Sequence, residues 1–118
     1  MTHRGRLFWE RNLAARSLED TVYGTVARLR VKDGMQAAFE QNLKDFESRQ
    51  TPGFLRILLY RTDADHNEFI MTVAFIDKAA YVANAESPEQ AADYEGMRAL
   101  LESDPEWNDG EIVLEFAR

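Results

Sequence analysis

The side chains best suited to chemistry in this chain are aromatic and polar groups on segments expected to form a sheet and its covering helices. They are Tyr23, Tyr60, Phe75, Tyr81, Asn84, Tyr94, Arg98 and Trp107. A cavity lined by such groups would bind a flat, apolar, partly hydroxylated molecule. In that cavity Arg98 could stabilise a phenolate, and Tyr81 or Asn84 could place an oxygen atom by hydrogen bonding.

Most of these side chains also have a purely structural interpretation. Packing in the core or in a dimer interface explains the tyrosines outside position 81, and also Trp107, without any catalytic role. Arg98 could instead pair with Glu95 or Glu102 along its own helix. The sequence alone leaves both interpretations open for Tyr81 and Arg98.

Several other kinds of active site lack their parts. The chain has no cysteine, and its two histidines, His3 and His66, fall outside the segments expected to line a pocket. Serine–histidine–aspartate and cysteine–histidine catalysis are therefore not expected. No glycine-rich phosphate or dinucleotide loop is present, and no carboxylate cluster has the spacing of a calcium loop. The sequence predicts neither a cofactor nor a bound metal.

Composition narrows the possible partners. The 118 residues carry a net charge of −7, which argues against binding to nucleic acid or to an anionic membrane surface. No apolar run reaches the roughly 18 residues of a membrane span. The first residues also lack the apolar core of a signal peptide. We expect a single-domain cytoplasmic protein.

Apolar periodicity and turn residues predict seven elements. They are a strand over 22–31, a helix capped by Asp33 and ending before Pro52, strands over 54–60 and 69–76, helices over 78–85 and from Ser87 to 103, and a strand over 111–116. Residues 107–110 (WNDG) are expected to form a turn before the last strand. Residues 1–21 are expected to be an extension, either frayed or packed through Leu7, Phe8 and Trp9, ahead of a domain over 22–118.

With the two later helices counted as one helical region, the element order is β-α-β-β-α-β, the ferredoxin-like α+β arrangement, in which a four-stranded antiparallel sheet carries both helical regions on one side. The other face is expected to be apolar. Its residues are Val26, Ile57, Leu59, Ile70 and Ala74, with either Val113 or both Ile112 and Leu114. Because an exposed apolar patch of this kind marks an interface, we expect a homodimer that packs sheet against sheet.

Two stretches, VYGTVARLRVKDGMQAAFE and TPGFLRILLYRTDADHNEFIMTVAFIDKAAYVANAESPEQ, resemble the antibiotic biosynthesis monooxygenase (ABM) domain, a family of dimeric α+β barrels. The resemblance covers roughly residues 22–116. Its most specific part is Pro52-Gly53-Phe54, followed by two strands and a helix that carries Tyr81. Members of the family include cofactor-free monooxygenases of polyketide phenols, quinol monooxygenases and heme-degrading enzymes.

The resemblance can be carried over at four positions. Tyr81 and Arg98 match a tyrosine and an arginine of the polyketide-tailoring members, which place their pocket between the sheet and the helices. Phe75 stands where those members have tryptophan, and Met71 where they have asparagine. We therefore expect Tyr81 and Arg98 to point into one cavity with Phe75 as a wall, although two hydrogen-bonding groups of the family pattern are missing.

The heme-degrading branch does not fit. Its members use an axial histidine on the helix after the third strand, and the segment 77–103 contains none. Their strand asparagine also falls near Ala27. Specific heme binding is therefore not expected.

Two functions from different classes follow from these residues. The first is a cofactor-independent monooxygenase that acts on a small aromatic or quinol-like molecule, favoured by Tyr81 and Arg98. The alternative is a non-catalytic dimeric barrel that binds a small apolar ligand or serves as an interaction module, favoured by Phe75 and Met71. Fold alone does not decide between them.

Overall fold

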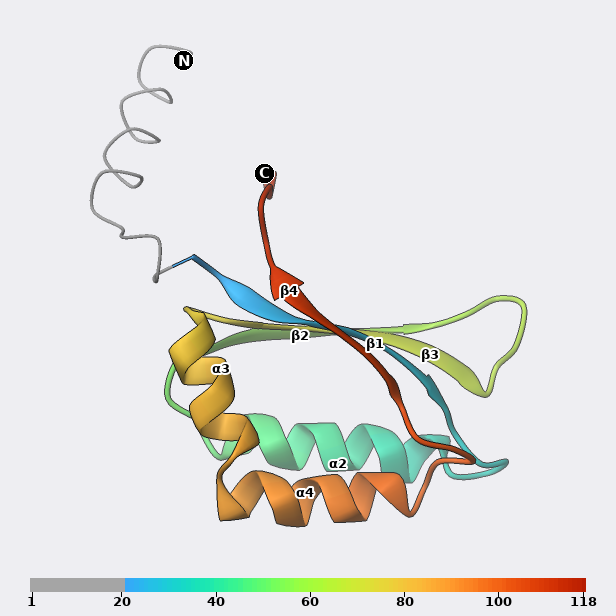
Figure 1. Ribbon diagram of the computed structural model, residues 1–118. Coiled ribbons are helices and arrows are strands. Elements are labelled where there is room, and N and C mark those ends of the chain that lie inside the picture. The colour runs from blue at the N-terminus through green and yellow to red at the C-terminus, as the bar shows by residue number, and fades with distance from the viewer. Residues whose placement is uncertain (1–20) are drawn as a thin grey trace.

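A computed structural model describes residues 21–118 and contains a four-stranded antiparallel sheet covered on one side by three helices (Figure 1). The elements are β1 (Tyr23–Arg30), α2 (Gln36–Ser48), β2 (Phe54–Arg61), β3 (Glu68–Phe75), α3 (Lys78–Ala85), α4 (Pro88–Arg98) and β4 (Glu106–Glu111). The strand order is β2-β3-β1-β4. The predicted ferredoxin-like α+β fold is confirmed, and so is the division of its second helical region into two helices, α3 and α4. The expected extension lies almost wholly outside the described residues.

The core lies between the sheet and the helices. Alternate residues of β1 point toward the helices, and Ala27 and Leu29 are buried there. Phe39 of α2 is fully buried and packs against Phe69 of β3, with 5.3 Å between the ring centroids. Met97 of α4 is buried in the same cluster. The helix spacing that brings Phe39 and Phe46 onto one face of α2 is therefore the spacing that anchors this helix on the sheet.

The start of α2 differs from the prediction. Its N-cap is Met35, and no side chain caps it. Asp33, expected to be the cap, instead accepts a hydrogen bond from Asn67 Nδ2, and Gln36 Nε2 donates to Asn67 Oδ1 at 2.6 Å. The two polar residues of the expected capping box thus tie the start of the helix to the β2–β3 loop.

The predicted N-termini of the two later helices are confirmed. Asp77 caps α3 by accepting a hydrogen bond from Ala80 N at 2.8 Å, and Ser87 caps α4 by accepting one from Gln90 N at 3.1 Å. Ahead of them, Gly53 adopts a φ of +79°, and a Cβ there would lie 2.6 Å from Ala80 Cβ. Glycine therefore lets the turn before β2 pass directly beneath the start of α3.

The chain after α4 was predicted wrongly. The helix ends at Arg98 rather than at 103, because Leu101 pairs with Val31 in an isolated bridge and Glu102 N donates to Arg30 O at 2.8 Å. The last strand is Glu106–Glu111 instead of 111–116. Residues 107–110, expected to be a turn, pair with β1, so that Trp107 lies opposite Ala27. Pairing with β1 outweighs the local turn signal.

A β-bulge in β2 overturns part of the predicted face assignment. Phe54 pairs with Phe75, and the next pairing is Arg56 with Ala74, so one residue is extra. An extra residue reverses the direction of every side chain beyond it. Ile57 and Leu59, expected on the helix-free face, therefore point toward the helices and pack against the core.

The helix-free face carries partly exposed apolar side chains. Val26 is 48% exposed, Leu58 49% and Tyr60 57%. Ile70 and Thr72 of β3 lie beside them, since Tyr60 pairs with Ile70 and Leu58 with Thr72. The chain after β4 rises from this same side of the sheet (Figure 1). The predicted homodimer interface remains a prediction, with Leu58 and Tyr60 in place of Ile57 and Leu59.

No helix in residues 21–118 has both the length and the apolar character that crossing a membrane requires.

Candidate functional site

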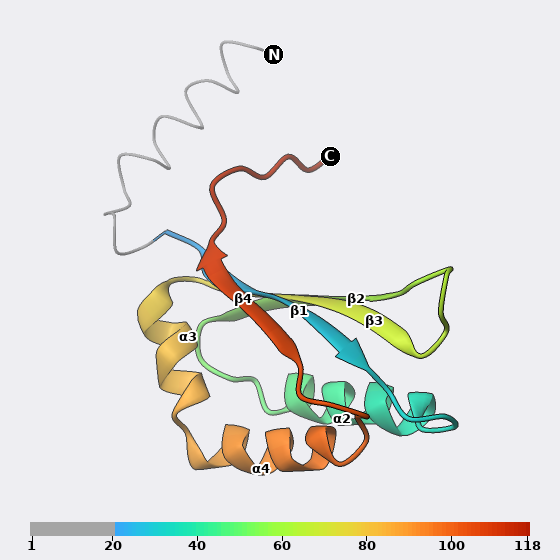
Figure 2. The ribbon, with the colours of Figure 1, turned by 45° about the vertical axis from the view of Figure 1, so that its right-hand side comes forward.

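A cavity of about 450 Å³ lies between the sheet and the three helices. Figure 2 shows how the chain encloses this region: α3 descends from the sheet at one end and leads into α4, which lies beside α2. Its wall is mostly apolar, with a few polar groups. The lining residues are Thr25, Asn42, Leu43, Phe46, Ile57, Met71, Val73, Phe75, Tyr81, Asn84, Ala85, Gln90, Ala91, Asp93, Tyr94, Met97, Trp107 and Asp109. An apolar chamber with few polar groups is typical of a small-molecule site.

Tyr81 and Asp109 form the central polar pair of the cavity. Tyr81 Oη donates a hydrogen bond to Asp109 Oδ1 at 2.9 Å, which joins α3 to β4. Burial raises the pKa of Tyr81 well above its usual range, and the hydrogen bond to the Asp109 carboxylate raises it further. At neutral pH the Tyr81 phenol is therefore uncharged, with its proton directed to Asp109.

Two aromatic rings hold the Tyr81 ring in place. Phe75 meets it edge to face at a centroid distance of 5.7 Å, and Tyr23 meets it at 5.2 Å. Tyr23 of β1 and Phe75 of β3 lie opposite each other in the sheet, so neighbouring residues of two strands supply both contacts to the Tyr81 ring. Edge-to-face contacts restrict the orientation of a ring. The phenol of Tyr81 is thus fixed by packing as well as by its hydrogen bond.

Two buried polar atoms on the cavity wall have no hydrogen-bond partner in the described part of the chain: Thr25 Oγ1 and Asn84 Oδ1. Thr25 is only 5% exposed and lies opposite Asp109 in the β1–β4 pairing. Its hydroxyl lies near the Tyr81 phenol and offsets part of the rise in that pKa, but no hydrogen bond of normal geometry joins the two groups. Buried polar groups are normally paired, so both atoms mark positions where a ligand or water would bind.

A second polar group borders the cavity where α2 meets α4. Arg49 at the end of α2 pairs with Asp93 at 2.7 Å, and its guanidinium lies 5.0 Å from the centroid of the Phe46 ring. Gln90 Oε1 accepts from Asn84 Nδ2 at 3.4 Å and from Arg49 at 3.5 Å. Arg49 therefore neutralises one of the two carboxylates of the wall.

The predicted site residues fall into three groups. Phe75, Tyr81, Asn84, Tyr94 and Trp107 line the cavity. Tyr23 is not on the wall but packs behind Tyr81. The two remaining residues, Tyr60 and Arg98, lie elsewhere. The substrate-binding and catalytic roles assigned to the lining residues stay predictions.

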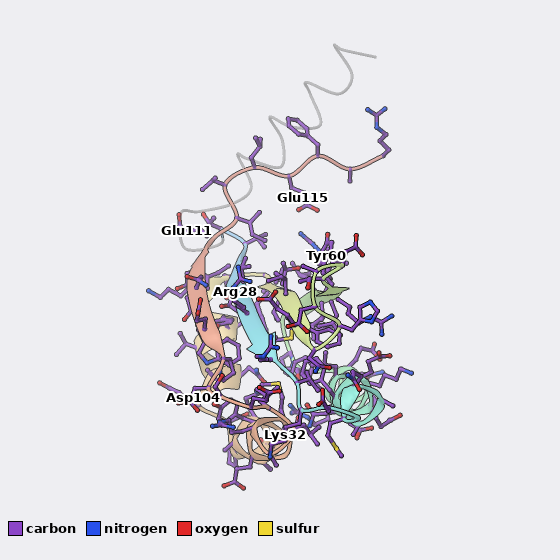
Figure 3. The ribbon with its side chains drawn as sticks, turned by 90° about the vertical axis from the view of Figure 1, so that its right-hand side faces the viewer. Arg28, Lys32, Tyr60, Asp104, Glu111 and Glu115 are labelled. Atoms are coloured by element: carbon purple, nitrogen blue, oxygen red, sulfur yellow. The ribbon has the colours of Figure 1, made fainter. Side chains whose placement is uncertain are left out.

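Arg98 does not point into the cavity, so the predicted pairing of Tyr81 with Arg98 in one site is wrong. Its Nε donates to Asp104 Oδ1 at 2.7 Å, and an Nη donates to Leu101 O at 3.0 Å. Both partners belong to the segment that follows α4, and Figure 3 shows Asp104 at the outer edge of the molecule. Because α4 ends at Arg98 instead of continuing to residue 103, the Arg98 side chain binds the segment that follows. These contacts hold the end of α4 in place.

Tyr60 lies on the opposite side of the sheet from the cavity, and Figure 3 shows it directed away from the helices. The cause is the bulge near Leu55, which sets the direction of every later side chain in β2. Tyr60 is therefore excluded from this site by position.

Sequence reasoning missed Thr25, Asp93 and Asp109 as wall residues. A signal existed for Thr25, because it is the one threonine on the apolar face of β1 that includes Ala27 and Leu29. Asp109 gave no such signal, since it falls in a segment whose composition is that of a turn. Only the pairing of β4 with β1 brings it to the cavity.

The fold and its cavity define a class: a ferredoxin-like α+β domain with a cavity between the sheet and the helices. The model of the antibiotic biosynthesis monooxygenase family matches residues 22–94, and the chain belongs to this family. Comparison with curated protein sequences found no match.

Solved structures of the same fold are similar to this chain. One is a mutant form of SnoaB, a cofactor-independent oxygenase from Streptomyces nogalater; the TM-score is 0.72 at 20% identity, over 83% of this chain and 99% of that one. Another is a candidate antibiotic biosynthesis monooxygenase from Caulobacter crescentus, with a TM-score of 0.71 at 19% identity over 89% and 98% of the two chains. At these identities the likeness shows the fold.

Nowhere in residues 21–118 do three or more histidine or acidic side chains come together in an arrangement suited to a metal ion.

Proposed function

We propose that this protein is a cofactor-independent monooxygenase that acts on a small aromatic, quinol-like or anthrone-like phenol in the cavity between the sheet and the helices. The observation that carries the proposal is the Tyr81–Asp109 hydrogen bond of 2.9 Å within an otherwise apolar, aromatic wall. Membership of the ABM family and the fold shared with SnoaB support the same reaction class.

In this reaction the substrate supplies the electrons that reduce oxygen. For an anthrone-type phenol, the reacting CH₂ group loses two hydrogens and gains one oxygen atom of O₂, and the other oxygen atom leaves as water. The protein has to position the phenol, exclude bulk water and receive a proton. Tyr81 would orient the substrate oxygen, and Asp109 would accept the proton, because it is the lining carboxylate that Arg49 does not neutralise.

A non-catalytic role is the second candidate, and the position of Arg98 favours it. With Arg98 bound to Asp104, no cationic side chain is among the described residues of the cavity wall. Phe75 and Met71 add apolar surface where family members carry hydrogen-bonding groups. Such a chamber would also suit a small apolar ligand that is bound and not converted.

Oxygen consumption distinguishes the two candidates. Purified protein free of flavin and metal is mixed with anthrone or hydroquinone, and O₂ uptake is followed with an electrode. We expect uptake above the uncatalysed rate, one atom of ¹⁸O₂ in the anthrone product, and a loss of about 10²-fold in Tyr81→Phe. Arg98→Ala is the matched control, since it removes a polar side chain outside the cavity, and it should retain turnover.

Two results would contradict the proposal. Uptake equal to the uncatalysed rate with both phenols, together with a rise in melting temperature on adding them, would favour the binding role. Wild-type turnover in Tyr81→Phe would instead remove Tyr81 from the reaction.

We propose further that the protein forms a homodimer through the helix-free face of the sheet. The partly exposed Val26, Leu58 and Tyr60 on that face support the assembly, because leaving them wet forgoes about 25 cal/mol for each Å² of apolar surface that a partner would cover.

A further inference from the structure

In the described part of the chain, the cavity wall lacks the positively charged side chains that would bind an anion. Among the described residues, the charged side chains on the wall are Asp93 and Asp109, and no lysine, arginine or histidine lines it. Arg49 neutralises Asp93 at 2.7 Å. The remaining charge, on Asp109, is negative and engages one uncharged donor, the Tyr81 phenol, at 2.9 Å. An anionic ligand would be repelled where a hydroxyl group would be accepted.

The two wall atoms without a hydrogen-bond partner among the described residues, on Thr25 and Asn84, are also able to accept hydrogen bonds. Asn84 directs its NH₂ group to Gln90, so the atom left without a partner is its carbonyl oxygen, an acceptor. The buried Thr25 hydroxyl, which can both accept and donate, lies opposite Asp109 across the β1–β4 pairing. Tyr81 and Asn84 are three residues apart on α3 and thus share one face of that helix. The wall therefore has two acceptor positions, one at Asp109 and Thr25 and one at Asn84.

We infer that the cavity selects an uncharged, flat ligand with two hydroxyl groups, one bound by Asp109 and Thr25 and the other by the carbonyl oxygen of Asn84. The methyl ethers and the carboxylate analogue of such a ligand are rejected, because they leave the acceptors unpaired or add a like charge. This inference rests on the proposed function only in using the same cavity, since recognition does not require turnover.

Calorimetric titration under argon at pH 7 tests the inference without any reaction. The probes are 1,5-dihydroxynaphthalene, its monomethyl and dimethyl ethers, and 5-hydroxy-1-naphthoate. We expect the affinity to fall about 10-fold with each methyl group and at least as much with the carboxylate, the scale of about 1.4 kcal/mol per lost hydrogen bond. Equal binding of the diol and its dimethyl ether, tighter binding of the carboxylate, or no binding of any probe would overturn the inference.

Three variants locate the selectivity. Asn84→Leu should reduce the preference for the diol over the monomethyl ether to less than about 3-fold, because it removes one of the two acceptor positions. Thr25→Val should reduce the preference by a smaller factor, because the Asp109 carboxylate of the other position remains. Thr72→Val is the matched control, since Thr72 lies opposite Val26 and Leu58 on the helix-free face and the change is the same. If the control loses selectivity as Thr25→Val does, the wall assignment is wrong.

Should Thr25→Val fail to fold, Thr25→Ser keeps the hydroxyl and must keep the preference. The binding experiment and the oxygen-uptake experiment can also fail independently of each other. Selectivity for the diol without oxygen uptake would leave the inference standing and remove the monooxygenase proposal. Oxygen uptake together with equal binding of all the probes would support the monooxygenase proposal and overturn the inference.

Discussion

The two faces of the sheet share the same strands but have different surroundings. Toward the helices, Leu29 is 1% exposed and Phe69 2%, and both belong to one apolar cluster. On the other face, Val26, Leu58 and Tyr60 are all between 48% and 57% exposed. The helix side thus completes its packing within one chain, whereas the other side presents apolar surface without cover among residues 21–118.

The difference separates the two tasks of the fold. The helix-covered face contains the cavity, so the polar groups on its wall, Thr25, Tyr81 and Asp109, meet whatever enters it. The partly exposed apolar side chains of the helix-free face suit a flat partner surface. Ligand binding and assembly can therefore be tested by substitutions on opposite faces of the same strand.

The largest expected difference between the faces is in stability. Phe39→Ala should lower the free energy of unfolding by about 3–5 kcal/mol, because Phe39 is fully buried and packs on Phe69. Leu58→Ala is the matched substitution on the helix-free face. It should cost about 0.5 kcal/mol or less in dilute solution, where any dimer is dissociated. Urea unfolding followed by circular dichroism measures both.

Similar losses for the two variants at nanomolar concentration would show that the helix-free face packs within one chain as tightly as the core does. The contrast between the faces would then be wrong.

The second prediction concerns assembly. Wild-type protein should sediment at about twice the chain mass of 13.6 kDa. Ile70→Asp should give a folded monomer, since a charge placed in the sheet-to-sheet interface without a partner costs several kcal/mol. Ile57→Asp should instead destabilise the fold, because the bulge in β2 turns Ile57 toward the helices and the cavity.

A wild-type monomer at micromolar concentration would contradict the proposed dimer. A folded Ile57→Asp monomer would contradict the face assignment that the bulge implies.

Much of the fold could be predicted from local signals. The two central strands, the caps of α3 and α4 and the element order follow from apolar spacing, from Asp77 and Ser87, and from the Pro52-Gly53 turn. The bulge near Leu55 could not be predicted, because an extra residue leaves no mark in a strand that is apolar on both sides. The position of β4 could not be predicted either, since its composition is that of a turn and its pairing with β1 is a long-range effect.

The site was predictable to a smaller extent. Tyr81, Asn84 and Phe75 were found because they follow one another along β3 and α3. Arg98 was misplaced because its spacing from Tyr94 fixes a position on α4 but not the direction of a long side chain, which Asp104 and Leu101 beyond the helix end bind outside the cavity. Asp109 depended wholly on the pairing between β1 and β4.

The third prediction concerns the pKa of Tyr81 in the cavity. Spectrophotometric titration of the four tyrosines should show one group that ionises well above the usual range near pH 10. In Asp109→Asn this pKa should fall but stay above its usual range, because burial is the largest cause of the rise and the Asp109 carboxylate is a smaller one. Tyr60, on the exposed face, offers the control: Tyr60→Phe should leave the late-ionising group in place.

The sign of the pH dependence follows from that raised pKa. Tyr81 contributes stability that is fully present below the unfolded-state pKa of about 10 and is lost as the pH rises toward the folded-state value. Tyr81→Phe should therefore flatten the alkaline limb of the stability curve above pH 10. An unchanged limb would show that the Tyr81 phenol is not held as described.

The smallest expected effect lies at the end of the sheet, in the β2–β3 loop. Asp65 accepts a hydrogen bond from Asn67 N at 2.9 Å and pairs with Arg30 of β1 at 2.6 Å. These contacts, the first of them foremost, hold the pKa of Asp65 below its usual value. A depressed folded-state pKa contributes stability that is present above the unfolded value of about 3.9 and is lost as the pH falls through the folded-state pKa. Because the pair is solvated, the contribution is small.

Asp65→Asn keeps the acceptor for Asn67 but loses the charge, so it should be slightly less stable than the wild type at pH 7 and equal to it near pH 2. Asp63→Asn, two residues away in the same loop, makes the identical change without an ion pair among residues 21–118 and should match the wild type at both values. Thermal unfolding at the two pH values measures the difference, and a gap that widens toward acid would mean that Asp65 does not stabilise the fold as an anion.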